Sequence, residues 1–410
     1  MTGCEKRYRT VRLGSVRLAM ALMSLVSFAA CQSHTETYGG ERRKVEAPPT
    51  KDVTQAMAVT KSRANDDMQA VLDEFQQLGP KPIESLSAQD ARDQPTPAEA
   101  VVEVLEEQDR SAEPQAVARV ENRTIPGPGG KLPVRIYYPY GQGPFPIVVY
   151  YHGGGWVIGT VDTYDASARA LCRAADAIIF SVEYRKAPEH KFPAAHEDAF
   201  AAYQWVSRHA ESIGGDPSLV AVAGESAGGN LAGAVPLMAR ARNERMPVHQ
   251  VLIYPVTGSD MNTPSYRDNE QAKPLNKAMM AWFFEKYLKD PADGKSPWIN
   301  LVGNEDLKGL PPATIITAEI DPLQSEGRRY AERLREAGVP VTYRNFEGVT
   351  HEFFGMGAVV RDAKQAVRVV GRDLDRSFEQ AAVEESDDRR MRRPRAADSQ
   401  KQSGDRIVIR

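Results

Sequence analysis

A serine flanked by two glycines is the pattern in this chain that most directly indicates chemistry. The segment Gly224–Gly228 reads Gly-Glu-Ser-Ala-Gly; it follows the apolar run Val220–Ala223, and a helical stretch begins near Ala227. A sharp turn between a strand and a helix strains such a serine and exposes its Oγ atom, and the glycines prevent clashes across the turn. The pattern therefore predicts that Ser226 is a nucleophile, with the N-terminus of a helix favouring the negative charge that develops there.

A glycine-rich segment upstream contains groups suited to the same reaction. The apolar run Pro146–Tyr151 leads into His152–Trp156, which reads His-Gly-Gly-Gly-Trp. Attack of a serine on an acyl carbon creates an oxyanion, which is stabilised by backbone N–H groups held in place beforehand. The expected donors are N–H groups of the consecutive glycines Gly153, Gly154 and Gly155, together with that of Ala227. A phosphate-binding loop is the alternative, but no Gly-Lys-Ser/Thr ending follows. We expect His152 to be a structural hydrogen-bonding residue.

The base of a serine triad should follow the nucleophile and the acid in the chain. Only His249 and His351 follow Ser226. His249 precedes the predicted strand Gln250–Tyr254, whereas His351 follows the predicted strand Val339–Asn345 and a short loop. Active sites of parallel sheets form at the carboxyl ends of the strands. His351 is therefore the predicted base.

Three acidic residues are candidates for the acid that orients this base. Asp321 and Glu319 follow the predicted strand Ala313–Thr317, and Glu326 lies on the next helical stretch. Asp321 is preferred because Pro322 would rigidify the turn and begin the following helix. Such a triad transfers an acyl group in two steps through an acyl-enzyme intermediate.

The elements that must position these residues alternate between strand and helix patterns. The predicted strands are Leu132–Tyr138, Pro146–Tyr151, Ala177–Val182, Leu219–Ala223, Gln250–Tyr254, Ala313–Thr317 and Val339–Asn345. The predicted helices between and after them are Ala194–Arg208, Ala227–Arg242, Lys277–Leu288, Gln324–Ala337 and Ala358–Arg372. This alternation predicts an α/β fold with a mostly parallel central sheet flanked by helices. Two amphipathic helices, Met68–Leu78 and Ala98–Leu105, precede the first predicted strand and are expected to form a cap within residues 65–115.

Composition narrows the possible partners. The chain has 410 residues, is 41% hydrophobic and carries a net charge of −3. Its length allows a large core, and its charge gives no reason to expect a nucleic-acid partner. We see no His/Cys cluster spaced for a metal, so we expect neither a metal nor an organic cofactor.

The first thirty residues have the pattern of an export signal. The stretch Lys6–Arg17 is basic, and the apolar run Leu18–Ala30 is too short to span a bilayer. Residues Phe28–Cys31 resemble a bacterial lipoprotein cleavage box, which implies cleavage before Cys31 and acylation of that residue. An ordinary secretory signal is the alternative. We expect a signal peptide in residues 1–30 and a flexible tether in residues 31–64. The protein is then expected to be exported and anchored to a membrane through Cys31, either facing the periplasm or on the outer membrane. A secreted or periplasmic protein is the alternative.

The rest of the chain is expected to contain one catalytic domain and a tail. The domain is assigned to residues 65–377 and a charged disordered tail to residues 378–410. Contact of this tail with an anionic surface is the alternative. Loss of Cys4 with the signal and acylation of Cys31 would leave Cys172 without a disulfide partner, and Cys172 is expected to be a small buried residue.

Four motifs in order resemble the hormone-sensitive-lipase-like family (family IV) of α/β-hydrolases. They are His152–Trp156, Gly224–Gly229, Asp321–Leu323 and His351. Further stretches that fit are Val182–His190, Phe192–Ala195 and Gly215–Pro217. The resemblance covers roughly residues 65 to 375. It implies an α/β-hydrolase fold, a Ser226–Asp321–His351 triad, and an oxyanion hole from two of Gly153, Gly154 and Gly155 plus Ala227. It also implies hydrolysis of short- to medium-chain carboxylic esters without a cofactor.

Two positions depart from this family, and a pocket can be assigned by analogy with it. Glu225 stands where the family more often has Asp, and Glu352 stands where many members have Gly, a change that could alter access to the site or the basicity of the base. The family's cap implies a further contribution from Met279–Phe284. We expect Trp156, Trp282 and Phe283 to form the walls of an acyl pocket, or else to be core residues.

Three other functions compete with ester hydrolysis. An amidase or peptidase would use the same triad. A ligand-binding member of the fold would be expected to lack a triad residue, whereas this chain has all three. A surface lipoprotein scaffold would explain the tether and the tail but none of the motifs.

Overall fold

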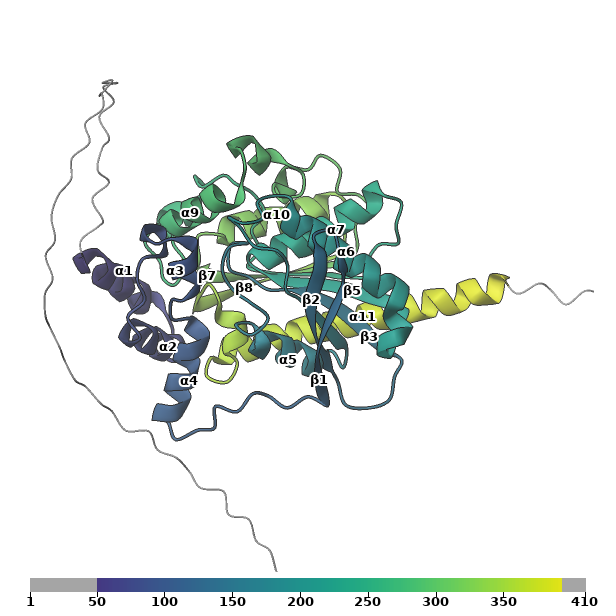
Figure 1. Cartoon of the computed structure of the whole chain (residues 1–410), viewed down its shortest axis with the longest axis horizontal. Coiled ribbons are helices and arrows are strands. Elements are labelled where there is room, and N and C mark those ends of the chain that lie inside the picture. The colour runs from purple at the N-terminus through teal and green to yellow at the C-terminus, as the bar shows by residue number, and fades with distance from the viewer. Residues whose placement is uncertain (1–49, 393–410) are drawn as a thin grey trace, which may run out of the picture. The chain divides into compact units, whose positions relative to one another are not determined.

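The centre of the molecule is an eight-stranded sheet, seen here in a computed structural model that describes residues 50–392 (Figure 1). The strands are β1 (Arg119–Gly127), β2 (Gly130–Tyr138), β3 (Phe145–Tyr151), β4 (Ile178–Val182), β5 (Gly215–Glu225), β6 (Gln250–Ile253), β7 (Ala313–Ile320) and β8 (Val341–Thr350). Their order across the sheet is β1-β2-β4-β3-β5-β6-β7-β8. β1 and β2 are antiparallel to each other and β2 is antiparallel to β4, while β4, β3, β5, β6, β7 and β8 run parallel. The predicted mostly parallel sheet is confirmed.

Helices cover both faces of this sheet. They are α1 (Thr50–Arg63), α2 (Asp66–Gln77), α3 (Ala88–Arg92), α4 (Pro97–Glu107), α5 (Asp165–Ala174), α6 (Ala194–His209), α7 (Ala227–Ala241), α8 (Pro264–Asp268), α9 (Lys277–Tyr287), α10 (Gln324–Glu336) and α11 (Arg361–Arg392). Along β3, Ile147 and Val149 join the core beneath α6, α7 and α10, whereas Val148 and Tyr150 join the core beneath α5 and α11. Alternate side chains of a strand point to opposite faces, so this central strand is buried on both sides.

The N-terminal helices form the cap. In Figure 1, α1 to α4 gather at one end of the sheet, near α9, and contacts between α1 and α2 and between α2 and α4 hold them together. Helix α2 begins at an Asn65 cap, whose side chain accepts from the N–H of Met68 at 3.1 Å. Helix α4 begins with a capping box between Thr96 and Glu99 and has Pro97 in its first turn. These sequence signals fix where the cap helices start.

Two boundaries differ from the predicted ones. Helix α1 occupies part of the predicted tether, because Met57 and Thr60 are buried against the domain although the segment is polar overall. Helix α11 continues past Phe378, where the tail was predicted to begin, and ends at Arg392. Its added turns are rich in Glu, Gln, Ala and Arg, which favour helix over coil. The predicted signal, the first part of the tether and residues 393–410 lie outside the described residues.

Two strand assignments also change. β1 was missed because Ile125 is its only buried residue, so the strand shows little apolar pattern. β8 was predicted to stop at Asn345, but it continues to Thr350 and pairs with β7 across a register shift. Because β8 ends at Thr350, His351 is the first residue after the strand.

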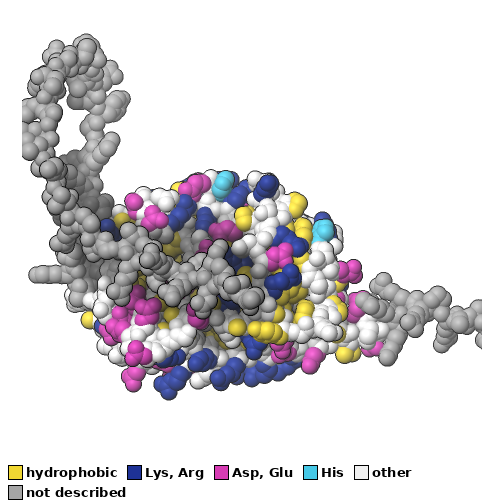
Figure 2. All heavy atoms as spheres, turned by 60° about the horizontal axis from the view of Figure 1, so that its bottom comes forward, with side chains coloured by type: hydrophobic (Ala, Val, Ile, Leu, Met, Phe, Trp, Pro, Cys, Tyr) yellow, Lys and Arg dark blue, Asp and Glu magenta, His cyan; other side chains and the backbone are white. Residues whose placement is uncertain are grey.

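The surface carries charges of both signs. On the face drawn in Figure 2, basic side chains gather along the lower edge and acidic ones toward the left, with hydrophobic side chains scattered between them. Within residues 50–392, no helix combines the length and the apolar character needed to cross a membrane.

Candidate active site

Ser226 occupies the turn between β5 and α7. Its backbone has φ +56° and ψ −118°, a conformation that is uncommon for a residue with a side chain. The flanking glycines are required by close approach: a Cβ added at Gly224 would lie 2.1 Å from the carbonyl oxygen of Gly228, and one at Gly228 would lie 2.0 Å from that of Tyr151. The strained turn predicted from the sequence is therefore present.

The structure brings the three predicted triad residues together. The Nε2 atom of His351 lies 2.9 Å from Ser226 Oγ, and its Nδ1 atom lies 2.7 Å from Asp321 Oδ2. The other carboxylate oxygen of Asp321 accepts from the N–H of Leu323 at 2.8 Å. All three side chains are buried. With a neutral imidazole, Nδ1 donates to Asp321 and Nε2 accepts from the serine hydroxyl.

The two rival acids point elsewhere. Glu319 Oε2 accepts from the N–H of Gly348 at 2.8 Å, and its side chain is 41% exposed. Glu326 Oε1 accepts from the N–H of Thr257 at 2.7 Å. Among the contacts of the described residues, neither carboxylate reaches the imidazole that Asp321 holds.

His152 and His249 are also buried, and each makes contacts of a structural kind. His249 lies at the start of β6 and its Nε2 atom is 2.9 Å from Thr314 Oγ1. His152 Nδ1 lies 2.8 Å from the oxygen of Gly153, and its ring stacks on Tyr184 with centroids 4.2 Å apart. Burial lowers the pKa of each of these two histidines to about 4. These contacts agree with a structural role for His152.

The charges around His351 favour its protonated form. Burial by itself lowers the pKa of His351, but the neighbouring Asp321 carboxylate, with smaller contributions from Glu352 and Glu225, more than reverses this, so the pKa is raised from its ordinary value. A more basic imidazole is a better proton acceptor, and its charged form is stabilised during the reaction.

Glu225, next to the nucleophile, lies beneath the site. The hydroxyls of Tyr150 and Tyr254 both donate to its carboxylate through short hydrogen bonds. Burial, together with the nearby Glu352 carboxylate, raises the pKa of Glu225 to about 7. The departure seen in the sequence thus places a partly protonated carboxyl group under the serine at neutral pH.

The glycine loop after β3 leaves its N–H groups available. Gly154 and Gly155 have φ +95° and +57° and line the cavity beside Ser226. Among the described residues, no hydrogen bond uses the N–H groups of Gly153, Gly154 or Gly155. Ala227 is the first residue of α7, where N–H groups have no partner within the helix. These are the groups predicted to form the oxyanion hole.

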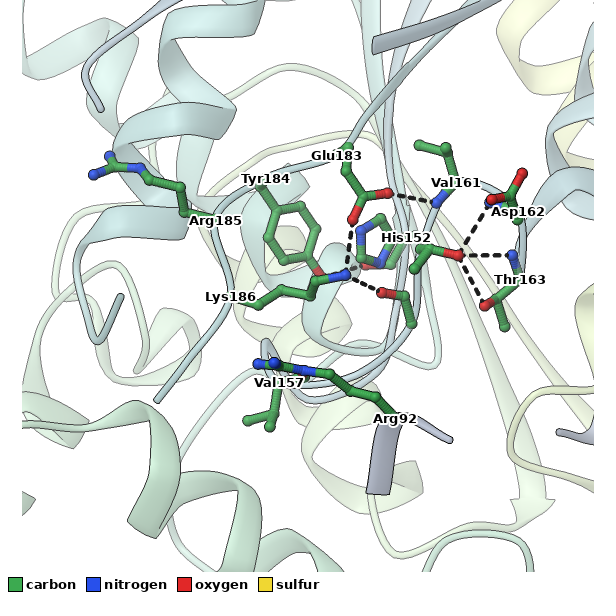
Figure 3. A network of polar contacts seen from close by, with 12 residues as sticks. Arg92, His152, Val157, Val161, Asp162, Thr163, Glu183, Tyr184, Arg185 and Lys186 are labelled. Carbon is green, nitrogen blue, oxygen red and sulfur yellow. Dashed lines mark hydrogen bonds and ion pairs between the residues drawn. The ribbon is translucent and has the colours of Figure 1, made fainter. Parts of the chain in front are cut away.

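Charged side chains surround the segment that follows these glycines, as Figure 3 shows. Glu183 accepts from the N–H of Val161 and from Lys186 Nζ, each at 2.8 Å. From α3, Arg92 donates through Nε to the carbonyl oxygen of Val157 at 2.9 Å. The chain after the glycines is therefore held at two places, by Arg92 of the cap and by Glu183 just after β4. These contacts help to preorganise the backbone N–H groups of the glycine loop.

A cavity of about 180 Å³ opens beside the triad. Its apolar lining comes mainly from the cap and α9: Phe75, Ile83, Leu275, Met279 and Phe283. Its polar lining includes Arg92, Gln94, Thr160, Lys186 and Glu352. Ser226 and His351 lie in the same wall.

The predicted pocket residues divide into one that lines the cavity and two that do not. Phe283 lines it and packs against Gly155, where an added Cβ would lie 2.2 Å from the ring. Trp156 has a φ of +60°, is fully buried and stacks on Tyr287, with ring centroids 4.5 Å apart. Trp282 is also a core residue, since neighbouring positions of a helix point about 100° apart. The assignment of both tryptophans to the pocket is corrected.

Sequence reasoning missed several polar residues of the site. Lys186 lies in the Val182–His190 stretch, which was noted for its resemblance but received no role. Arg92 and Tyr164 belong to segments with no recognisable motif, so only the folded chain reveals them.

Cys172 is buried on α5, and burial raises the pKa of its thiol to about 12, which agrees with a packing role. Within the described part of the chain, no three His, Cys, Asp or Glu side chains cluster to hold a metal ion.

Comparison with known proteins identifies the family. A family profile described as alpha/beta hydrolase fold matches residues 148–355, which span the glycine loop, the nucleophile turn and the base. The chain belongs to the α/β-hydrolase fold family. This confirms the fold class that the motifs predicted.

Several relatives of this hydrolase are named as esterases. A carboxylesterase of Mycobacterium tuberculosis, NlhH, is 44% identical over 253 residues, which are 60% of this chain and 79% of the relative. An ethyl acetate hydrolase of Pseudomonas putida is 33% identical over 293 residues, covering 70% of this chain and 90% of the relative. The solved structure of a hyperthermophilic esterase from the archaeon Pyrobaculum calidifontis, 38% identical, superposes with a TM-score of 0.67 and covers 73% of this chain and 95% of that one. The hydrolase is a serine ester hydrolase of the carboxylesterase type.

Proposed function

We propose that the hydrolase cleaves short- to medium-chain carboxylic esters through an acyl-enzyme on Ser226, with His351 as base and Asp321 as the acid that orients it. One observation carries the proposal: a single imidazole lies 2.9 Å from the serine hydroxyl through Nε2 and 2.7 Å from the aspartate through Nδ1. This is the geometry needed to take a proton from the serine as it attacks.

The reaction proceeds in two steps. Ser226 Oγ attacks the ester carbonyl while His351 Nε2 accepts its proton, and the oxyanion is held by N–H groups of the glycine loop and of Ala227. His351 then gives the proton to the departing alkoxide. Water attacks the acyl-enzyme in the same way and releases the acid. Asp321 holds the imidazole tautomer that this sequence requires.

The size of the cavity supports small substrates. Its volume of about 180 Å³ is close to the roughly 150 Å³ of an engineered protein cavity that holds benzene. The apolar wall from the cap suits a short acyl or alkyl chain. The description of one relative as an ethyl acetate hydrolase points to the same size class.

Hydrolysis of p-nitrophenyl esters from acetate to palmitate, by the chain from Gln32 onward and by its Ser226→Ala variant, tests the proposal. We expect the highest kcat/KM on short chains and loss of activity in the variant. Parallel assays on matched anilides separate an esterase from an amidase or peptidase. A folded protein that is inactive at every chain length would contradict the proposal and favour a ligand-binding role.

We also propose that the protein is exported and held at a membrane by lipid on Cys31. The support is the basic and apolar pattern of residues 1–30 and the Phe28–Cys31 segment. Metabolic labelling with an alkyne fatty acid in a bacterial host, followed by membrane fractionation, tests this for the native chain and for Cys31→Ala. We expect label and membrane association only in the native chain. Unlabelled native protein in the soluble fraction would indicate an ordinary secretory signal.

A further inference from the structure

Glu352 directly follows the predicted base and lines the cavity with it. Its backbone has φ +72°, a left-handed conformation that glycine adopts without cost and that is uncommon for a residue with a side chain. The side chain is 23% exposed, and the cavity that it lines also includes Ser226 and His351. A carboxylate is thus held beside the reacting groups in a backbone conformation better suited to glycine.

The contacts of Glu352 place it on the reacting side of the imidazole. Its Oε1 atom accepts from the Tyr164 hydroxyl at 2.8 Å and lies 3.7 Å from His351 Nε2. Nε2 is the nitrogen that faces Ser226, whereas Asp321 lies at Nδ1 on the opposite side of the ring. A carboxylate has about four acceptor positions, and Tyr164 occupies one of them.

Other charged groups that line the cavity are already paired. Lys186 lies 2.8 Å from Glu183, and Arg92 forms two hydrogen bonds with Glu189 at 2.7 and 2.9 Å. Among the described residues, His351 is the only basic group within ion-pair distance of Glu352. Before it accepts a proton this imidazole is neutral. When His351 is in the neutral form that accepts the serine proton, Glu352 has no cationic partner among the described residues.

The reaction brings part of the substrate to this carboxylate. The departing alkoxide takes its proton from His351 Nε2 and must approach that atom to about 3 Å. Because Glu352 Oε1 lies 3.7 Å from the same nitrogen, groups two or three bonds from the departing oxygen come within its reach. A hydroxyl there would donate to the carboxylate and a cation would be attracted, whereas a second carboxylate would be repelled.

We propose that Glu352 is a specificity-determining residue that selects esters whose leaving alcohol bears a hydroxyl or a cationic nitrogen two carbons from the ester oxygen. The substrate class is then esters of diols, polyols and amino alcohols. The inference rests on the proposed ester hydrolysis and names the alcohol half of its substrate.

Matched pairs of acetates of nearly equal shape test the inference. 2-Hydroxyethyl acetate is compared with n-propyl acetate, and acetylcholine with 3,3-dimethylbutyl acetate. The measured quantity is the ratio of kcat/KM within each pair, because a general loss of catalysis lowers both members and leaves the ratio unchanged. Hydrolysis of p-nitrophenyl acetate serves as the reference reaction for every protein.

Two variants and one control separate charge from hydrogen bonding. Glu352→Gln removes the charge and keeps an oxygen for Tyr164, so the acetylcholine ratio should fall roughly two- to fivefold, as for loss of a partly exposed charge pair. Glu352→Gly removes every acceptor at a position whose φ suits glycine, and the hydroxyethyl ratio should fall about tenfold. Glu347→Gln makes the same exchange at an exposed position of β8 outside the cavity lining, and its ratios should equal those of the native enzyme.

The outcomes distinguish this inference from the proposed function. A native enzyme that hydrolyses p-nitrophenyl acetate, prefers the polar member of each pair and loses that preference in the Glu352 variants supports the inference. Activity on p-nitrophenyl acetate with ratios unchanged in Glu352→Gly overturns the inference alone. Absence of p-nitrophenyl acetate hydrolysis by the native enzyme overturns the proposed function, and the inference with it.

Discussion

The triad and the cavity beside it are built in different ways. Ser226, Asp321 and His351 each lie directly beyond the carboxyl end of a parallel strand, so strand register and one tight turn decide where they lie. The cavity is assembled from cap helices, α9 and single residues of several loops, which come together only when the whole chain has folded. The reaction chemistry is therefore encoded locally, whereas the choice of substrate depends on long-range packing.

The strongest test of the local side of this comparison is Asp321→Asn. Asparagine keeps the shape but stabilises the wrong imidazole tautomer, and in serine proteases the equivalent exchange lowers kcat by about 10⁴. We expect a loss of the same order here, measured on p-nitrophenyl acetate. Glu319→Gln is the matched control, because Glu319 bonds to the Gly348 N–H instead of to the base. Near-normal turnover of Asp321→Asn would show that another acid orients His351.

A smaller loss of kcat is expected from a substitution at Gly155, where the glycine loop contacts α9. An alanine there would place its Cβ 2.2 Å from the Phe283 ring, and a φ of +57° strains a residue with a side chain. We expect the loop to shift in response, which would move its N–H groups. Loss of one oxyanion donor lowers kcat by roughly 10² to 10³. Gly309→Ala is the control, since Gly309 has φ +67° but no neighbouring atom within 4 Å. Equal activity of the two variants would remove Gly155 from the oxyanion hole.

The same division explains what the sequence could and could not predict. The positions of Ser226, His351 and Asp321 could be predicted because each residue lies directly after a strand end. Trp156 and Trp282 were misassigned because the face on which an aromatic side chain packs depends on tertiary contacts, as does the burial of α1 through Met57 and Thr60. Arg92 and Tyr164 reach the site from segments that carry no local pattern.

A pair of substitutions in α9 tests how long-range packing determines the choice of substrate. Phe283→Ala enlarges the cavity, so we expect the preferred acyl chain to lengthen by roughly two to four carbons, as follows from the volume of the lost ring. Trp282→Ala should leave chain-length preference unchanged and lower the free energy of unfolding by about 3–5 kcal/mol, because this side chain packs in the core. The measurements are kcat/KM across the p-nitrophenyl series and denaturant unfolding. A changed preference in Trp282→Ala alone would reverse the assignment.

The smallest expected effect concerns Glu225. Its position is determined by the strand β5 on which it lies, whereas its protonation depends on burial by elements distant in the sequence. Its pKa is raised from an ordinary 4.5 to about 7 in the folded protein, so the native state retains a proton that the unfolded chain has lost between these values. The free energy of unfolding should therefore fall as the pH rises from about 4.5 to 7, by about 3 kcal/mol from this group. Glu225→Gln cannot ionise and should flatten this slope in denaturant unfolding measured at pH 5 and pH 8. An unchanged slope would mean that the hydroxyls of Tyr150 and Tyr254, which donate to the carboxylate, offset the cost of burying its charge.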